Sequence, residues 1–113
     1  MKTHVMKLSD RPFNAIATGT KTIESRLYDA KRQEISIGDE IIFAHAEKPE
    51  IQVKARVVGL LRYQTFEDMF TRNSPQKFGG KSVAELLSQI SQFYSSSDQK
   101  RLGVIGIELV LIV

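Results

Sequence analysis

The stretch 51–63, where apolar and polar residues alternate, constrains the fold of this chain more than any other feature. Its first half reads Ile51, Gln52, Val53, Lys54, Ala55, Arg56 and Val57. Successive side chains of a strand point to opposite faces, so this pattern predicts a long strand with one apolar face. Gly59 interrupts the pattern and predicts a bend or a bulge.

Four shorter segments also have strand character: 4–8, 21–27, 41–45 and 104–113. Only Glu108 interrupts the apolar character of the last one. Such a run is typical of a central strand covered on both faces.

Helix signals lie between these strands. Ser-Asp-Arg-Pro at 9–12 predicts a helix start, and Gly19 is placed to end that helix. Thr65 with Asp68 resembles a capping box and predicts a short helix through Phe70.

A second capping box, Ser82 to Glu85, predicts a later helix. Its helical spacing places one apolar face on Val83, Leu86, Leu87, Ile90 and Phe93. The segment 73–80 contains a proline and two glycines and is expected to be an exposed loop, and the serines at 95–97 are expected to form a turn.

This order of elements predicts an α+β fold with a curled sheet of about five to six strands, flanked by short helices. The 113 residues show no internal repeat and no linker, and they fit one domain of the usual size of roughly 100–150 residues. We therefore expect a single domain over 1–113.

Composition excludes several classes of protein. The chain has no cysteine, so it has neither a disulfide framework nor a thiolate metal site. Its two histidines, His4 and His45, are far apart, and no carboxylate cluster has metal-ligand spacing, so we expect no metal and no cofactor. No apolar run approaches the roughly 20 residues of a membrane helix, and no signal region opens the chain. We expect a cytoplasmic protein without a membrane partner.

The net charge of +3 is a mild basic excess that permits a polyanionic partner. Arg26, Lys31 and Arg32 are close together in sequence, and Lys100 with Arg101 forms a second, weaker cluster. Lys31 and Arg32 would be phosphate contacts if RNA binds, and ordinary surface charges otherwise.

One motif carries most of the potential chemistry. The segment 19–27 has the pattern G-x-K-x-x-E-x-R at the junction of a helix and a strand. Glu24 and Arg26 are two apart and share a strand face, and the long side chain of Lys21 could reach the same pocket from the strand mouth. Three charged groups so close together are costly to bury without partners.

Two interpretations follow from the motif. In one, Glu24 and Arg26 form an ion pair on a solvated strand face, worth less than about 1 kcal/mol. In the other, Arg26 and Lys21 hold a phosphate or a carbonyl in a pocket, and Glu24 orients them or acts as a general base.

This segment resembles the signature of the ASCH domain family, named for homology to the activating signal cointegrator. The similarity to short bacterial and archaeal members extends over Met6–Leu8, Pro12-Phe13, Ile16, Gly19, Lys21–Glu24, Arg26-Leu27, Asp29, Lys31-Arg32, Gly38-Asp39 and Ile41–Phe43. The late helix, Tyr94 and the strand beginning at Gly103 also fit, so the resemblance covers nearly the whole chain.

The resemblance implies a PUA-like β-barrel that binds RNA in a cleft near the motif. Some small bacterial relatives are amidohydrolases that deacetylate acetylated cytidine, and some relatives cleave RNA. In the amidohydrolase branch a threonine stands at the position of Glu24, and a glutamate stands where this chain has Gly79-Gly80. The lysine at Lys21 is shared. Because Glu24 replaces that threonine, its hydroxyl is absent here, which argues against deacetylation by the same mechanism.

Other candidates are weaker. Four aromatic residues flanked by polar or basic neighbours could stack on a base: Tyr28, Tyr63, Phe78 and Tyr94. Tyr94 is the preferred exposed one, because it follows the late helix where the serine-rich turn begins. His45 on an apolar strand is more often a satisfied residue at a barrel edge than a ligand.

Two hypotheses remain open. As a binding module, the chain would hold RNA or a nucleoside-like ligand with Lys21, Glu24, Arg26, Lys31, Arg32 and Tyr94. As an enzyme, it would use Glu24 to activate water and Lys21 to stabilise an oxyanion, acting on a nucleoside amide or an RNA phosphodiester.

Overall fold

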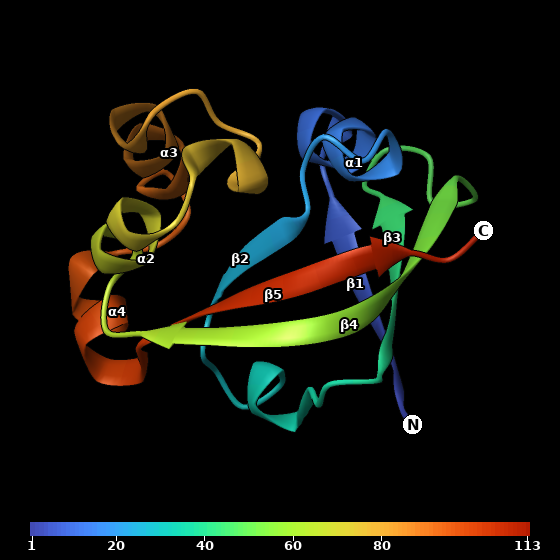
Figure 1. Cartoon of the computed structure of the whole chain (residues 1–113), viewed down its shortest axis with the longest axis horizontal. Helices are drawn as coiled ribbons and strands as arrows, with labels where there is room; N and C mark the ends of the chain where they lie inside the picture. Colours follow the sequence, from blue (N-terminus) through green and yellow to red (C-terminus); the bar gives the residue numbers. More distant parts are fainter.

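The computed structural model describes all residues, 1–113, and its α+β architecture confirms the predicted fold class (Figure 1). In chain order the elements are β1 (Thr3–Leu8), α1 (Asp10–Ala17), β2 (Ile23–Leu27), the 3₁₀ turn η1 (Arg32–Glu34), β3 (Glu40–His45), β4 (Gln52–Tyr63), α2 (Phe66–Arg72), the 3₁₀ turn η2 (Pro75–Phe78), α3 (Val83–Ile90), α4 (Ser96–Leu102) and β5 (Val104–Leu111).

The five strands form one mixed sheet in the order β1-β3-β4-β5-β2. β1 and β3 are parallel, and the other neighbours are antiparallel. Figure 1 shows β1 and β3 crossing behind β4 and β5, which gives the sheet its curled, half-barrel shape. The register of β4 with β5 shifts between Val57 and Gly59, which confirms the predicted bulge.

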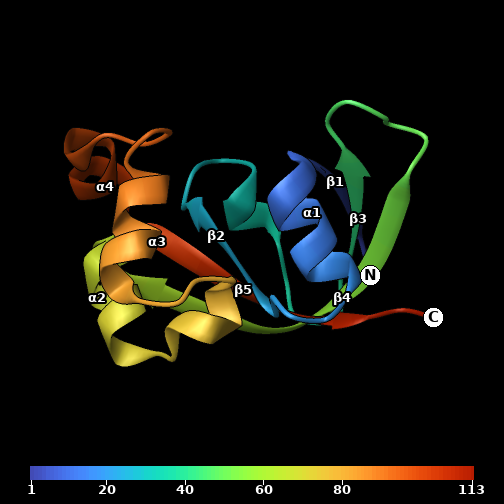
Figure 2. The ribbon, with the colours of Figure 1, turned by 90° about the horizontal axis from the view of Figure 1, so that it is seen from above.

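Apolar side chains gather into two core clusters. The first joins Phe13 and Ile16 of α1 to the inner face of the sheet, including Ile105 and Ile107. The second joins α2, η2 and α3 to Val104 and to apolar residues of β2. Neighbouring residues of β5 thus enter different clusters, so β5 is covered on both faces, as its apolar sequence predicted. β2, at the sheet edge, passes between α1 and α3 (Figure 2).

Two local expectations are wrong. The segment 73–80 is not simply an exposed loop, because it contains η2 and buries Phe78, whose ring packs edge-on against Phe70. Phe93 does not continue the apolar face of α3. The helix ends at Ile90, and Phe93 is 73% exposed.

The serine-rich segment is a helix start and not a turn. The Ser95 hydroxyl accepts a hydrogen bond from the Asp98 N–H at 3.1 Å, and α4 follows. The capping side chains of α2 and α3 act as predicted, since Thr65 accepts from Asp68 N–H and Ser82 accepts from Glu85 N–H. At the start of α1, Ser9 takes the N-cap position, but its side chain forms no capping hydrogen bond. None of the four helices has the length and apolar character needed to cross a membrane.

Candidate functional site

The turn between α1 and β2 places the charged motif at the sheet edge. After α1 ends at Ala17, Gly19 adopts φ +81°, a backbone conformation that side chains disfavour. The chain then reverses, and the Lys21 N–H donates to the Ala15 carbonyl at 2.9 Å. Lys21 is held beside α1 at the entry to β2.

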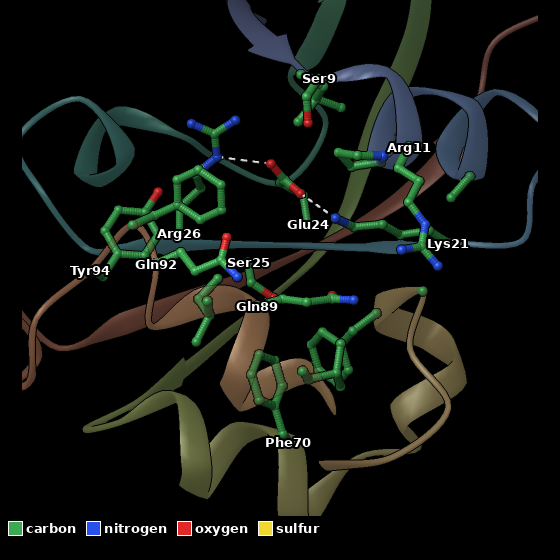
Figure 3. Close-up of a pocket in the computed structure, with 18 of the residues that line it drawn as sticks. Ser9, Arg11, Lys21, Glu24, Ser25, Arg26, Phe70, Gln89, Gln92 and Tyr94 are labelled. Atoms are coloured by element: carbon green, nitrogen blue, oxygen red, sulfur yellow. Dashed lines mark hydrogen bonds and ion pairs between the residues drawn. The ribbon is translucent and has the colours of Figure 1, made fainter. Parts of the chain in front are cut away.

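Lys21, Glu24 and Arg26 form a continuous ion-paired row, which we call the charged row. Lys21 Nζ lies 2.7 Å from Glu24 Oε1, and Arg26 Nε lies 2.8 Å from Glu24 Oε2 (Figure 3). Glu24 is only 3% exposed. The solvated-face interpretation is therefore wrong, and the expectation that Lys21 reaches the same pocket as Glu24 and Arg26 is confirmed.

Each carboxylate oxygen of Glu24 binds one cation, and this fixes the ionisation of the row. Burial alone would raise the pKa of Glu24, but the charges of Lys21 and Arg26 and their hydrogen bonds bring that pKa below its ordinary value of 4.5. Burial alone would lower the pKa of Arg26, but the negative charge of Glu24 outweighs burial, and the pKa of Arg26 is raised. At neutral pH the row is one carboxylate between two cations.

Both cations keep donors that the row does not use. Arg26 Nη2 donates to the Lys7 carbonyl at 3.3 Å, across the gap between the two edge strands. Arg26 Nη1 has no hydrogen-bond partner within the chain, and it is not buried. Lys21 Nζ has three protons and binds only Glu24. The row therefore presents oriented, unused N–H groups.

The row lines a cleft of about 610 Å³ between α1 and α3. On the α1 side the lining includes Lys7 and Arg11. The opposite side is apolar, aromatic and amide-bearing, with Phe70, Leu86, Gln89, Gln92, Phe93 and Tyr94. One wall is thus cationic and the other can pack against a flat apolar group.

The structure brings together four of the six candidate ligand-binding residues. Lys21, Glu24, Arg26 and Tyr94 line the cleft. Tyr94 is half-buried and not the exposed aromatic that was expected, because its ring stacks on Phe66 with 5.5 Å between centroids.

Lys31 and Arg32 do not line the cleft. They lie in and beside η1, and Arg32 pairs with Asp29 at 3.3 Å. Nearness in sequence to Arg26 does not bring them to the cleft, because the chain leaves the cleft at the end of β2.

The sequence analysis missed several cleft residues, among them Lys7, Arg11, Gln89, Gln92 and Phe93. Lys7 and Arg11 flank the predicted junction of the first strand and helix, which was the only available signal for them. Phe93 was assigned to the core because it continued the apolar spacing of the late helix.

The histidines have structural partners outside the cleft. His45 is buried, with Nε2 2.9 Å from Asp10 Oδ1, and its Nδ1 accepts from the N–H groups of Glu47 and Lys48. His4 Nε2 lies 2.9 Å from Asp39 Oδ2. No group of three His, Asp or Glu side chains is arranged to share a metal ion.

The buried carboxylates predict a loss of stability in acid. The hydrogen bond from His4 and those from backbone N–H groups hold the pKa of Asp39 far below 3.8, against the effect of burial, and the pKa of Glu24 is also lowered. A carboxyl whose pKa is lower in the folded state stabilises the fold above its unfolded pKa. We therefore expect the free energy of unfolding to be constant above about pH 5 and to decline as pH falls below about 4.5.

Urea unfolding between pH 3 and pH 7 measures this decline, and Asp39→Asn should make it shallower. Stability that rises on acidification would contradict the assignment of these carboxylates.

Comparison with known proteins gives the family. The sequence model described as the ASCH domain matches residues 6–112. No curated protein matches the chain. Among solved structures, the chain is 34% identical to hypothetical protein PH0355, with a TM-score of 0.85, covering 99% of this chain and 100% of the other.

Two further structures are similar. Protein PF0455 from Pyrococcus furiosus is 30% identical with a TM-score of 0.76, covering 99% of this chain and 98% of the other. The ASCH protein from Zymomonas mobilis is 14% identical with a TM-score of 0.66, covering 94% of this chain and 65% of the other, and it supports the fold alone. Because the family match spans nearly all of the sequence, this chain belongs to the ASCH domain family.

Proposed function

We propose that the cleft binds a nucleotide unit, as part of single-stranded RNA or as a free nucleotide. The observation that carries this proposal is the charged row, in which Glu24 holds Lys21 and Arg26 in place while both keep unused donors. Charge-assisted hydrogen bonds from such groups suit phosphate oxygens and base acceptors. Arginine in particular presents a planar set of donors that matches a phosphate.

Charge and size agree with this proposal. Lys7, Arg11, Lys21 and Arg26 line the cleft together with a single carboxylate, Glu24. A surplus of fixed positive charge attracts a polyanion and makes its binding depend on salt. The cleft volume of about 610 Å³ lies within the range of roughly 300–1,000 Å³ typical of small-molecule sites.

The aromatic wall supplies a surface for a base. Phe93 lines the cleft while 73% of it is exposed, and Tyr94 lies beside it with 6.5 Å between ring centroids. Exposing a phenylalanine gives no benefit to folding, whereas unstacked bases of single-stranded RNA pack on such rings. We therefore assign Phe93 as a stacking residue.

Phe93→Ala should weaken binding of a fluorescein-labelled single-stranded RNA by about tenfold or more, since one stacked base contributes roughly 1–3 kcal/mol. Fluorescence anisotropy measures the affinity. Stability should change by less than about 0.5 kcal/mol, because the ring is largely exposed.

Val110→Ala removes an exposed apolar side chain outside the cleft and serves as the control. The proposal fails if the wild-type protein binds neither the RNA nor a free nucleotide such as cytidine 5′-monophosphate. Equal affinities for the Phe93 variant and the wild type would remove Phe93 from the site.

Hydrolysis is a second candidate, since Lys21 and Glu24 are in direct contact at 2.7 Å. Glu24 would activate water and Lys21 would stabilise the oxyanion. However, both oxygens of Glu24 already bind cations and its pKa is lowered, which makes it a weak base. Incubation with acetylcytidine and with labelled RNA tests this function. Product that disappears in Glu24→Gln would favour the hydrolase over the binding module.

A further inference from the structure

The free edge of β2 forms the floor of the cleft. β2 pairs only with β5. Leu109 N–H donates to the Thr22 carbonyl, and Tyr28 N–H donates to the Gly103 carbonyl. Along an antiparallel pair of strands, every second residue forms a hydrogen-bonded pair with the residue opposite it, and the residues between point their backbone groups away from that neighbour. The even-numbered residues of β2 therefore direct their backbone groups to β5, and the odd-numbered residues direct theirs to the free edge.

Ser25 is the odd-numbered β2 residue that lines the cleft. Ser25 lies opposite Gly106 of β5, and these two residues form no backbone hydrogen bonds with each other. No hydrogen bond outside the sheet ladders involves its backbone N–H or carbonyl. Ser25 therefore offers the cleft one donor and one acceptor side by side.

Two free amide side chains face this edge. Gln89 on α3 and Gln92 just after it are exposed, and neither side chain forms a hydrogen bond within the chain. Figure 3 shows both amides extending into the cleft near Ser25, on the side away from the charged row. The centre of the cleft is therefore polar but neutral, between a cationic wall and an aromatic wall.

We propose that this neutral centre recognises the Watson–Crick edge of a nucleobase. The Ser25 N–H donates to a ring nitrogen or carbonyl oxygen of the base, and the Ser25 carbonyl accepts from the adjacent amine or ring N–H. Gln89 and Gln92, which both donate and accept, bind the remaining polar atoms of the base. The inference rests on the proposed nucleotide binding and adds recognition of the base to it.

The chemistry of a base fits this site better than that of a phosphate. Neighbouring strands use the same side-by-side N–H and carbonyl to pair with each other, and cytosine and adenine present an adjacent acceptor and donor in a similar arrangement. A backbone carbonyl repels a phosphate, which the cations of the charged row attract instead. Because Arg26, Phe93 and Ser25 line the same cleft, one nucleotide can place its phosphate, its ring face and its base edge on these three residues.

Amide hydrogen exchange, followed by NMR, tests the inference on the wild-type protein. Without ligand, the Ser25 amide should exchange much faster than the amides of Glu24 and Arg26, which face β5. Saturation with cytidine 5′-monophosphate should slow Ser25 exchange about tenfold or more. Ribose 5-phosphate, which lacks the base, should leave Ser25 exchange unchanged.

Ser25→Pro removes the same donor without removing a bond of the β2–β5 ladder, and proline is tolerated where a strand N–H faces outward. We expect about tenfold weaker binding of cytidine 5′-monophosphate and unchanged binding of ribose 5-phosphate. Val110→Ala, which lies outside the cleft, should bind both compounds like the wild type.

The outcomes separate this inference from the proposed function. Shifts of the Lys21 and Arg26 amides with cytidine 5′-monophosphate, without slower exchange at Ser25, would overturn base recognition and leave nucleotide binding standing. A Ser25 amide already protected without ligand would overturn it as well. If neither these compounds nor a short single-stranded RNA shifts any cleft amide, both proposals fail. Because hydrogen exchange is measured on the wild-type protein, it tests base recognition even if Ser25→Pro does not fold.

Discussion

Arg26→Ala is expected to weaken binding of single-stranded RNA by about 100-fold. The substitution removes the guanidinium whose Nη1 is unused and whose position is fixed by Glu24 and by the Lys7 carbonyl. A charge-assisted hydrogen bond contributes roughly 1.5–3 kcal/mol, and a factor of 100 corresponds to about 2.7 kcal/mol. Anisotropy at two salt concentrations should also show a shallower salt dependence, because one cation has been lost.

Arg56→Ala is the matched control for Arg26→Ala. It removes one positive charge from an exposed side chain paired with Glu40, outside the cleft. Its effect on affinity should be less than threefold at moderate salt, since distant surface charges are screened. Equal losses in the two variants would show that only net charge matters and would remove Arg26 from the binding site. The RNA affinity of Arg26→Lys should lie between those of the wild type and Arg26→Ala, because lysine keeps the charge but cannot contact both Glu24 and Lys7 in the same way.

Glu24→Ala should lower the free energy of unfolding by about 3–5 kcal/mol at neutral pH, since it leaves Lys21 and Arg26 close together and largely buried without their counter-ion. This is a large share of the roughly 5–15 kcal/mol by which domains are stable. Urea unfolding measures the effect. Glu40→Ala removes a partly buried carboxylate whose two cation partners, Lys54 and Arg56, are exposed and stay hydrated, so it should cost less than about 1 kcal/mol.

Replacing the whole charged row separates stability from binding. A triple variant replaces the three charged side chains with apolar ones of similar size: Lys21→Met, Glu24→Leu and Arg26→Met. Such replacements of buried ion pairs are often neutral or stabilising. We expect most of the stability lost in Glu24→Ala to return while nucleotide binding stays absent. A triple variant that still binds RNA like the wild type would contradict the functional role of the row.

The strands were predictable because a half-buried strand carries its pattern in its own sequence. The alternation of 51–63 predicted β4 and its bulge, and the apolar run 104–113 predicted the covered position of β5. The motif was predictable for a similar reason. Glu24 and Arg26 share a strand parity, and Gly19 indicated a turn that brings Lys21 to them.

The second wall of the cleft could not be predicted from local patterns. Phe93 fits the apolar spacing of α3, and only the end of that helix at Ile90 shows that its ring leaves the core. Tyr94 was expected to be exposed because it follows the late helix where the serine-rich segment begins, yet Phe66, far away in sequence, covers one of its faces. Lys7 and Arg11 enter the cleft through the fold, which places α1 beside the edge of β2.

An NMR titration of the wild-type protein with a short single-stranded RNA, and then with cytidine and acetylcytidine, tests the central claim most directly. We expect amide shifts to cluster at Lys21 to Arg26 and at Gln89 to Tyr94, the two walls of the cleft, with no product signals in the same tube. Shifts confined to other surfaces, or no shifts with any of these ligands, would contradict the claim that this cleft binds a nucleotide.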